Sequence, residues 1–297
     1  MIAARLSVLL AVVALSACGG SKAADKPAEK TPPPTAFGGP DRPVTLEVPD
    51  DYDAAKPYPL LLMIHGYMAS GIAEESLLHL SEPARARGFL YAHPDGTFDK
   101  SGARYWNDWP GGHDNSTVDD VGYLGKLVAD IRAAYNVDAK RIYFMGHSNG
   151  GAMSYRMACE RSDIVAAVAI LAGDMPVAVD SICKPNAEVH LLNTHGDMDS
   201  AVLYAGNASY LGAKACSEFW SKRGHCKSSG AGAPLDLTDG PGAETSVLRY
   251  SGCDPAGAVE LWTIAGAGHI PLFGTKFGSG TTYAERMLDF LLAHGKP

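Results

Sequence analysis

The chain has 297 residues and carries 33 acidic against 25 basic side chains, which gives a formal net charge of −8. This acidic balance, without a basic stripe, argues against a nucleic-acid-binding protein. Glycine is abundant, with 33 residues, and this is typical of a fold with many tight turns between strands and helices.

The N-terminus has the pattern of an export signal. Arg5 precedes the apolar run Leu6 to Leu15, which is shorter than the about 20 residues that a membrane-spanning helix needs. The run ends in Leu15-Ser16-Ala17-Cys18, which resembles the bacterial lipobox, where the cysteine is lipidated. We expect a signal peptide at residues 1–17 and an extracytoplasmic protein whose only membrane contact is the lipid on Cys18, at the outer membrane in a Gram-negative host. Ordinary secretion is the alternative.

Residues 18–40 predict a disordered tether. They are rich in Gly, Ala, Lys and Pro, including Pro32-Pro33-Pro34, and they have too few apolar residues to form a core. The remaining residues, 41–297, suit one α/β domain with a large core better than two small domains.

From Val44 onward, strand-like and helix-like segments alternate. Runs such as Leu60 to Ile64 are apolar on both faces, as strands buried between two helix layers must be. The order predicts an α/β fold with a doubly wound, mostly parallel sheet and helices on both faces. The expected strands are 44–48, 60–64, 89–92, 141–145, 165–171, 189–194, 246–250 and 259–264, and the expected helices are 72–87, 119–135, 149–160, 208–222 and 283–292.

The most informative motif is Gly146-His147-Ser148-Asn149-Gly150, which directly follows the expected strand 141–145. It matches the G-x-S-x-G nucleophile elbow, in which glycines let backbone segments approach a serine on a tight strand-to-helix turn. Glycine-rich turns also occur at strand ends that have no catalytic role. The assignment of Ser148 as a nucleophile therefore depends on a base and an acid elsewhere in the chain.

The base is expected on a turn near the C-terminus. His269 lies in Gly266-Ala267-Gly268-His269, just after the expected strand 259–264, whereas His225 ends a predicted helix and His294 lies in the tail. In a doubly wound sheet, catalytic groups sit after the carboxyl ends of the strands. We therefore assign His269 as the general base for Ser148.

The acid should follow another strand. His195-Gly196-Asp197-Met198-Asp199 follows the expected strand 189–194 and offers two carboxylates, which spacing alone does not separate. Asp174, after the preceding strand, is a third candidate. The order serine, aspartate, histidine is that of the α/β-hydrolases.

An oxyanion hole in such a fold uses two backbone amides. One belongs to the residue after the nucleophile, Asn149. The other is expected from His65-Gly66-Tyr67, which follows the strand 60–64, and we assign it to the amide of Tyr67.

Five cysteines remain after Cys18, and an exported protein is expected to form disulfides. Cys226 and Cys253 bracket a loop of small residues and one strand, and they form the first expected pair. Cys159 with Cys183 is the second. Cys216 is then left over and is expected to be buried in a helix. It lacks the neighbours that would activate a thiol.

Together these residues resemble the polyhydroxybutyrate depolymerase-like esterases, which include bacterial feruloyl and acetylxylan esterases. The resemblance covers residues 43–295 and implies an α/β-hydrolase fold. Its H-G-T-x-D motif implies Asp199 as the acid, with Asp197 where threonine is usual. Ile270-Pro271-Leu272 replaces the usual tryptophan-proline. The motifs that carry it are Tyr58-Pro59-Leu60, His65-Gly66, Pro94-Asp95-Gly96-Thr97, Trp106-Asn107, Asp119-Asp120-Val121-Gly122-Tyr123, Gly146 to Met153, His195-Gly196-x-x-Asp199 and Gly266-Ala267-Gly268-His269.

Other polar and aromatic residues have structural interpretations. Asp119 and Asp120 are expected to cap a helix and to tie down a buried loop. His65 and His147 are expected to be satisfied core or turn histidines. Spacing such as H-E-x-x-H is missing from the sequence, and the chemistry needs neither a metal nor a cofactor. Tyr105, Trp106 and Trp109 fit either a substrate platform or core packing.

The resemblance implies hydrolysis of carboxylic esters, with a polyester or oligoester as the first choice of substrate. Feruloylated or acetylated xylan is the alternative, and a peptidase of the same fold is a rival. A surface-anchored binding protein that has kept the hydrolase shell is an alternative of another class.

Overall fold

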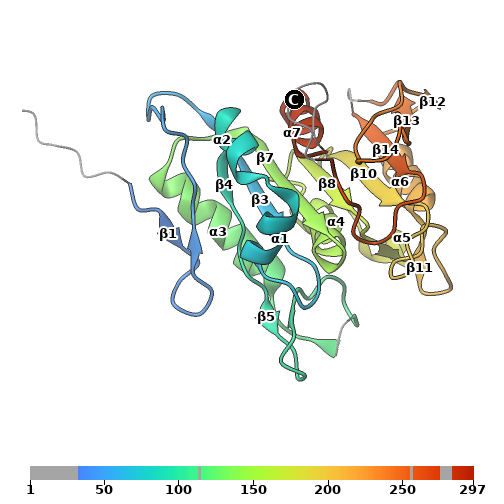
Figure 1. Cartoon of the computed structure of the whole chain (residues 1–297). Coiled ribbons are helices and arrows are strands. Elements are labelled where there is room, and N and C mark those ends of the chain that lie inside the picture. The colour runs from blue at the N-terminus through green and yellow to red at the C-terminus, as the bar shows by residue number, and fades with distance from the viewer. Residues whose placement is uncertain (1–32, 113–114, 255–256, 275–282) are drawn as a thin grey trace, which may run out of the picture. The chain divides into compact units, whose positions relative to one another are not determined.

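The buried apolar strands assemble into one eight-stranded sheet in the computed structural model (Figure 1), with the order β12-β13-β14-β10-β8-β7-β3-β4. Neighbours from β4 to β14 pair in parallel, and β13 and β12 add an antiparallel edge. The structure describes residues 33–112, 115–254, 257–274 and 283–297. The strands are β3 (Tyr58–Ile64), β4 (Leu90–Ala92), β7 (Val137–His147), β8 (Ala167–Leu171), β10 (His190–Gly196), β12 (Ser228–Ala231), β13 (Thr245–Ser251) and β14 (Val259–Ile264).

Helices cover both faces of this sheet. They are α1 (Gly71–Leu78), α2 (Ser81–Ala86), α3 (Asp120–Ala134), α4 (Asn149–Glu160), α5 (Val179–Ile182), α6 (Ala213–Arg223) and α7 (Tyr283–Ala293). Apolar side chains of α3, α4 and α6 join one core cluster, and those of α1, α2 and α7 join the other. The expected doubly wound α/β-hydrolase fold is confirmed.

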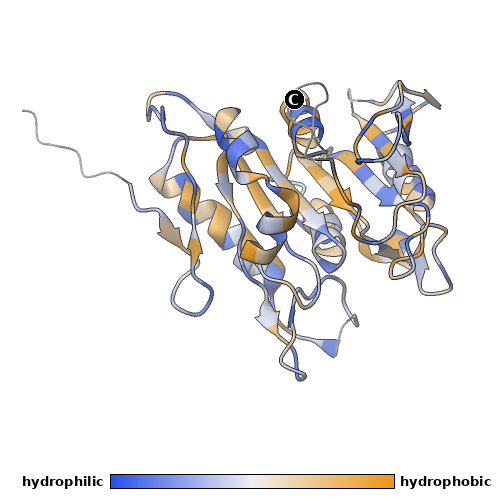
Figure 2. Ribbon diagram, viewed as in Figure 1, coloured by the Kyte–Doolittle hydropathy of each residue, from blue (hydrophilic) through white to orange (hydrophobic). Residues whose placement is uncertain are grey.

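Successive residues of a strand belong alternately to the two core clusters. Along β3, Leu60, Leu62 and Ile64 belong to the cluster under α3 and α4, whereas Leu61 and Met63 belong to the cluster under α7. All five are fully buried, because successive strand residues point to opposite faces. Hydrophobic colouring therefore follows the strands in Figure 2.

Three expected elements differ from the structure. The segment 72–87 forms two helices, because His79 adopts a left-handed conformation with φ 50° and Pro83 could not continue a helix without clashing with the carbonyl of residue 79. The segment 44–48 contributes only the two-residue strand β2 (Val44–Thr45). The segment 208–222 begins with strand β11 (Tyr210–Leu211), and its helix starts only after Gly212.

Short strands outside the main sheet were not expected from the sequence. They are β1 (Ala36–Phe37), which pairs with β2, β5 (Thr97–Phe98), which pairs with β6 (Arg104–Tyr105), and β9 (Met175–Pro176), which pairs with β11. Two residues give too short a pattern for alternation to be visible.

The expected boundary of the tether is corrected by β1. Phe37 packs against the core, the amide of Leu46 donates to the carbonyl of Thr35 over 2.7 Å, and the compact unit begins at Pro33. Residues 33–40 are therefore part of the folded unit. The expected signal peptide, Cys18 and the remainder of the tether lie outside the described residues.

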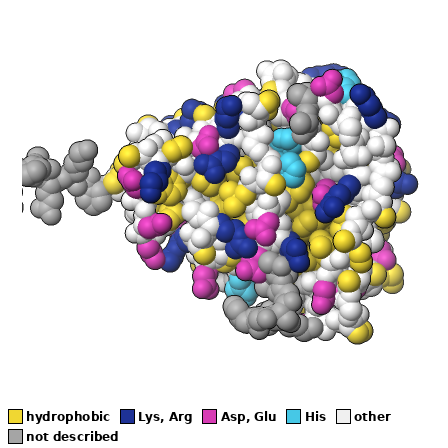
Figure 3. Space-filling model, turned by 90° about the horizontal axis from the view of Figure 1, so that it is seen from above, with side chains coloured by type: hydrophobic (Ala, Val, Ile, Leu, Met, Phe, Trp, Pro, Cys, Tyr) yellow, Lys and Arg dark blue, Asp and Glu magenta, His cyan; other side chains and the backbone are white. Residues whose placement is uncertain are grey.

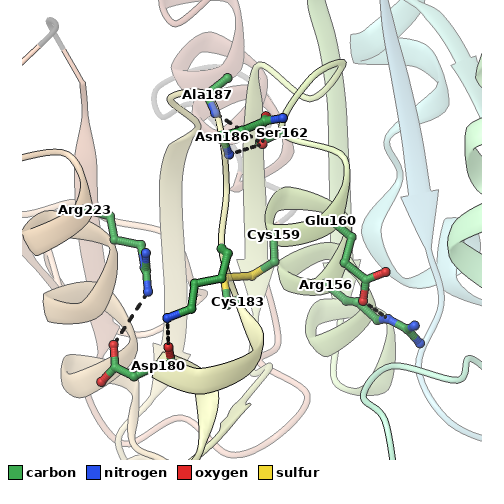
Figure 4. Close-up of a disulfide and its surroundings, with 10 residues drawn as sticks. Arg156, Cys159, Glu160, Ser162, Asp180, Cys183, Asn186, Ala187 and Arg223 are labelled. Atoms are coloured by element: carbon green, nitrogen blue, oxygen red, sulfur yellow. Dashed lines mark hydrogen bonds and ion pairs between the residues drawn. A yellow bond between two sulfur atoms is a disulfide. The ribbon is translucent and has the colours of Figure 1, made fainter.

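Two disulfides join the pairs that were expected, Cys159 with Cys183 and Cys226 with Cys253. Figure 4 shows the first, which ties the end of α4 to the segment after α5. Close by, the hydroxyl of Ser162 donates to Asn186 Oδ1 over 2.8 Å. Both disulfides fit an extracellular protein.

The described surface carries charges of both signs. On the face in Figure 3, acidic and basic side chains are interspersed, with hydrophobic side chains between them. Such mixing favours neither nucleic acid nor another polyanion as a partner on that face. Within the described ranges, no helix combines the length and the apolar character that crossing a membrane requires.

Candidate active site

Ser148 stands in a strained turn between β7 and α4, with φ 55° and ψ −122°. This backbone conformation is uncommon for a residue with a side chain and is typical of functional sites. A Cβ atom on Gly146 would lie 2.0 Å from the carbonyl oxygen of Gly150, and one on Gly150 would lie 2.0 Å from that of Ile64. Both glycines are therefore needed for the turn to close.

His269 bridges Ser148 and Asp199. The hydroxyl of Ser148 is 2.8 Å from His269 Nε2, and His269 Nδ1 is 2.8 Å from Asp199 Oδ2. Since a carboxylate only accepts, Nδ1 carries the proton and Nε2 is left to accept from the serine. The sheet brings these residues together because β7, β10 and β14 are parallel and the three side chains follow their carboxyl ends.

Asp199 is fixed by more than His269. Its Oδ1 accepts the amides of Ala201 and Val202 over 2.8 and 3.0 Å, and its Oδ2 lies 3.1 Å from His195 Nε2. Burial acts to raise the pKa of Asp199, but the hydrogen bonds from His195, His269 and Ala201 outweigh it and hold the pKa well below its usual range. The carboxylate is thus kept ionised and oriented.

The other two candidate acids have different contacts. Asp197 Oδ1 accepts the amide of Gly266 over 2.7 Å, so this side chain holds the turn that leads to His269. His269 Nδ1 pairs with Asp199 and not with Asp174, and burial next to Asp108 raises the pKa of Asp174 to about 6. The geometry favours Asp199.

The two segments that carry the expected oxyanion donors adjoin Ser148. A Cβ atom on Gly66 would lie 3.4 Å from Ser148 Cβ, so the segment that carries Tyr67 passes directly beside the nucleophile. The Tyr67 hydroxyl donates to Asp99 over 2.7 Å. The amide of Asn149 belongs to the first turn of α4, where helical amides have no acceptor within the helix.

The side chain of Asn149 has a role that the sequence did not reveal. Its Oδ1 accepts the amide of Trp106 over 2.8 Å, and its Nδ2 donates to the Trp106 carbonyl and to Asp108 over 2.9 and 3.0 Å. These bonds anchor the first residue of α4 to the 106–108 segment. The aromatic residues of the same region, Tyr105, Trp106 and Trp109, are all buried. They therefore pack in the core and do not form an exposed platform for a substrate.

The structural expectations for the paired aspartates agree with their contacts. Asp119 caps α3 by accepting the amide of Gly122 over 2.8 Å. Asp120 is fully buried and accepts from the amide of Asn107 and from Arg42, over 2.8 and 2.5 Å.

His65 and His147 are buried and hydrogen-bonded, as expected. His65 Nε2 accepts the amide of Gly96 over 2.9 Å, and burial lowers the pKa of His65. His147 Nδ1 lies 2.9 Å from Glu74 Oε1. In the described part of the chain, no cluster of three or more histidine, cysteine or acidic side chains is arranged to bind a metal.

Cys216 is buried in α6, and burial raises its pKa to about 12. Such a thiol is inert. A cavity of about 660 Å³ lies beside α6 and residues 185–189, and Ser148, Asp199 and His269 do not line it. The candidate site instead lies at the carboxyl ends of the central strands, where Ser148 and His269 are partly exposed.

Large apolar side chains are exposed on the segments that carry the site residues. We define the apolar rim as Met68, Ile72, Met198, Ile270 and Leu272, whose exposed fractions run from 54% to 79%. They follow β3, β10 and β14, the same strands that precede Tyr67, Asp199 and His269. Exposed apolar groups around a polar site are typical of a surface that binds an apolar partner.

Comparison with known proteins gives relatives among esterases, although no protein-family model matches the chain. Feruloyl esterase B of Piromyces equi is 32% identical over 239 residues, which are 77% of this chain and 42% of that protein. Feruloyl esterase D of Neurospora crassa is 25% identical over 251 residues, 80% of this chain and 77% of that protein. The chain thus spans less than half of the first relative and about three quarters of the second.

A solved structure shows the same fold. The acetyl xylan esterase from Aspergillus awamori aligns with a TM-score of 0.62 at 12% identity, over 84% of this chain and 94% of that one. The chain therefore has an α/β-hydrolase fold, in which Ser148, His269 and Asp199 are hydrogen-bonded in series. The chain is thus similar in sequence to feruloyl esterases and in fold to an acetyl xylan esterase.

Proposed function

We propose that the protein is an extracytoplasmic serine ester hydrolase that acts through Ser148, His269 and Asp199. The observation that carries this proposal is the continuous chain of hydrogen bonds from Asp199 through His269 to Ser148, with 2.8 Å at each step. A base within such reach of a hydroxyl, itself oriented by a third group, is the arrangement that activates a serine.

In this mechanism Ser148 Oγ attacks the ester carbonyl while its proton passes to His269 Nε2. The amides of Asn149 and Tyr67 stabilise the negative charge of the tetrahedral intermediate. His269 then returns the proton to the leaving alkoxide, and an acyl-enzyme forms on Ser148. A water molecule, deprotonated by His269, attacks the acyl-enzyme and releases the acid. Asp199 stabilises the imidazolium at both steps.

The test is hydrolysis of p-nitrophenyl acetate by the domain starting at Pro33. Ser148→Ala removes the nucleophile and is expected to lower kcat by about 10⁴-fold or more. Wild-type activity that survives this substitution would contradict the proposal. A wild-type protein without activity on any ester would favour the alternative of a binding protein.

For the substrate, we propose feruloyl or acetyl esters of plant cell-wall polysaccharide. The support comes from the relatives, which are named as feruloyl and acetyl xylan esterases. A polyester or oligoester of hydroxy acids is the second candidate, and the apolar rim favours it. Initial rates on methyl ferulate, acetylated xylan, hydroxybutyrate oligomers and a peptide anilide rank these candidates and the peptidase rival.

We also propose that the protein is exported and held to a membrane by a lipid on Cys18. The support is the Leu15-Ser16-Ala17-Cys18 sequence, together with two disulfides, which need an oxidising compartment. Cys18→Ala in the full chain is expected to move the protein from the membrane fraction to the soluble fraction. Retention of this variant with the membrane would contradict the anchor.

A further inference from the structure

Glu74 and His147 form a buried pair behind Ser148. Glu74 lies in the first turn of α1 with 3% of its surface exposed, and His147 ends β7 with 4% exposed. Glu74 Oε1 is 2.9 Å from His147 Nδ1. A buried ion pair contributes little net stability, because desolvation offsets the attraction between the charges. Because the pair contributes little net stability, its role follows from the other hydrogen bonds that Glu74 and His147 form.

The second atom of each side chain contacts the backbone of a segment in the active site. Glu74 Oε2 accepts the amide of Gly66 over 3.1 Å, and Gly66 precedes Tyr67, the proposed oxyanion donor. His147 Nε2 is 3.0 Å from the carbonyl oxygen of His269, the proposed base. The pair therefore connects the β3–α1 segment to the β14–α7 segment through the side chains of two buried residues.

These contacts specify the protonation state of His147. Both of its ring nitrogens face oxygens, one from a carboxyl group and one from a carbonyl. With Glu74 ionised, both hydrogen bonds form only when the ring carries two protons. Burial acts to lower the pKa of His147, but Glu74 and the His269 carbonyl outweigh it and raise the pKa. Burial acts to raise the pKa of Glu74, and His147 and the Gly66 amide outweigh it in turn.

The charged and titratable groups around the pair come from several elements. Asp199, which follows β10, adds to the stabilisation of the His147 cation, and His65, which follows β3, lies near Glu74. The ring of His269 has its centroid 5.0 Å from that of His147. Glu74 also acts on Tyr283 at the start of α7.

We propose that Glu74 and His147 are positioning residues, and that their ion pair holds the oxyanion segment and the catalytic histidine in register around Ser148. Neither side chain touches the reacting atoms, and both act through backbone groups. This inference rests on the proposed esterase function. It adds residues that lie outside the serine, histidine and aspartate triad.

Isosteric variants separate the two bonds of His147. In His147→Asn the amide can occupy the place of Nδ1 and bond Glu74, whereas in His147→Gln it can occupy the place of Nε2 and bond the His269 carbonyl. Both are expected to lower kcat for p-nitrophenyl acetate by about 10-fold to 100-fold, with little change in KM, because misplaced catalytic groups slow chemistry more than binding.

Glu74→Gln tests the other side of the pair. It is expected to lower kcat to a similar extent, and the double variant Glu74→Gln/His147→Gln should be little worse than either single variant, because both remove one connection. Additive losses would contradict a paired role. Glu75→Gln is the matched control, since Glu75 lies next to Glu74 in α1 but accepts from Ser81 and Tyr91.

The dependence of kcat on pH separates a positioning role from a purely structural role, because a purely structural role would leave the pH profile unchanged. Because the pKa of His147 is raised, the intact pair is present at lower pH and is lost as the pH rises through that raised value. Without the carboxylate in Glu74→Gln, the pKa of His147 should fall. The decline of kcat on the alkaline side should then begin at a lower pH than in the wild type, whereas Glu75→Gln should keep the wild-type profile.

The protonation state of His147 can also be measured in the wild-type protein, which does not require any variant to fold. In the wild-type protein with ¹⁵N-labelled histidine, NMR at neutral pH should show protons on both ring nitrogens of His147. A neutral ring, or a Glu74→Gln variant whose kcat and pH profile match the wild type, would overturn the inference while leaving the esterase proposal intact. Wild-type protein without Ser148-dependent hydrolysis would instead contradict the proposed function.

Discussion

At the scale of single residues, Asp199 and Asp197 illustrate how environment separates two similar side chains. They lie two positions apart after β10, yet Asp199 accepts from His269 and His195 while Asp197 accepts from the backbone of Gly266. Spacing in the sequence left the choice open, and the motif resemblance implied Asp199. The supporting His195 was missed, although its place four residues before Asp199 was a usable signal.

Asp199→Asn is expected to lower kcat by about 10⁴-fold, because an amide at this position no longer stabilises the imidazolium and favours the wrong tautomer of His269. Asp197→Asn is the matched control and should keep most activity, since its carboxamide oxygen can still accept from Gly266. Steady-state kinetics on p-nitrophenyl acetate measure both. Equal losses in the two variants, or the reverse order, would contradict the assignment of the acid.

Asp199 also makes stability depend on pH. Its pKa in the folded state is depressed, so its contribution is present above its unfolded pKa, about 3.9, and is lost as the pH falls through the folded value. In urea unfolding, the gap in the free energy of unfolding between the wild type and Asp199→Asn should be larger at pH 6 than at pH 3. A gap that is the same at both pH values would rule out this linkage.

At the scale of elements, the sequence predicted the long buried strands and α4 well, because apolar runs and the elbow motif are strong local signals. It failed where conformation depends on one residue, as at His79, which breaks the expected helix 72–87. Glu74 was not expected to be buried, because an acidic side chain on a short helix is usually exposed. Its burial depends on the tertiary contact with His147.

The disulfide between Cys159 and Cys183 ties α4 to α5 across 24 residues of sequence. Replacing both cysteines with alanine is expected to lower the free energy of unfolding by about 3 kcal/mol. The kcat should change little, because Cys159 lies near the C-terminal end of α4, whereas Ser148 directly precedes its first residue. Chemical denaturation and kinetics of the same variant measure the two effects. A large fall in kcat without a loss of stability would contradict this division.

At the scale of the whole molecule, the parallel order of β7, β10 and β14 explains why three loops far apart in the sequence form one site. The fold class and this convergence were predictable, because strand order in a doubly wound sheet sends catalytic groups to one edge. The apolar rim was not predicted as a surface, since exposure depends on how the loops fold. The expected tether also extended too far, because two-residue strand β1 left no clear pattern.

We expect the apolar rim to contribute to adsorption on a polymer surface but not to hydrolysis of a small ester. Met68→Ser/Leu272→Ser should weaken adsorption to polyhydroxybutyrate particles by about tenfold, because less apolar surface is removed from water. Hydrolysis of p-nitrophenyl acetate should stay near wild type. Ile182→Ser is the control, because Ile182 is exposed but lies in α5 outside the rim. Unchanged adsorption of the double variant would remove the support for a polyester substrate.

Labelling with a fluorophosphonate probe tests whether Ser148 is an activated nucleophile. The probe phosphonylates a serine only where a base raises its reactivity. We predict one adduct per chain, which peptide mass spectrometry locates on Ser148, and its loss in Ser148→Ala and strong reduction in a His269→Ala variant. A wild-type protein that stays unlabelled, or an adduct on another serine, would contradict the account.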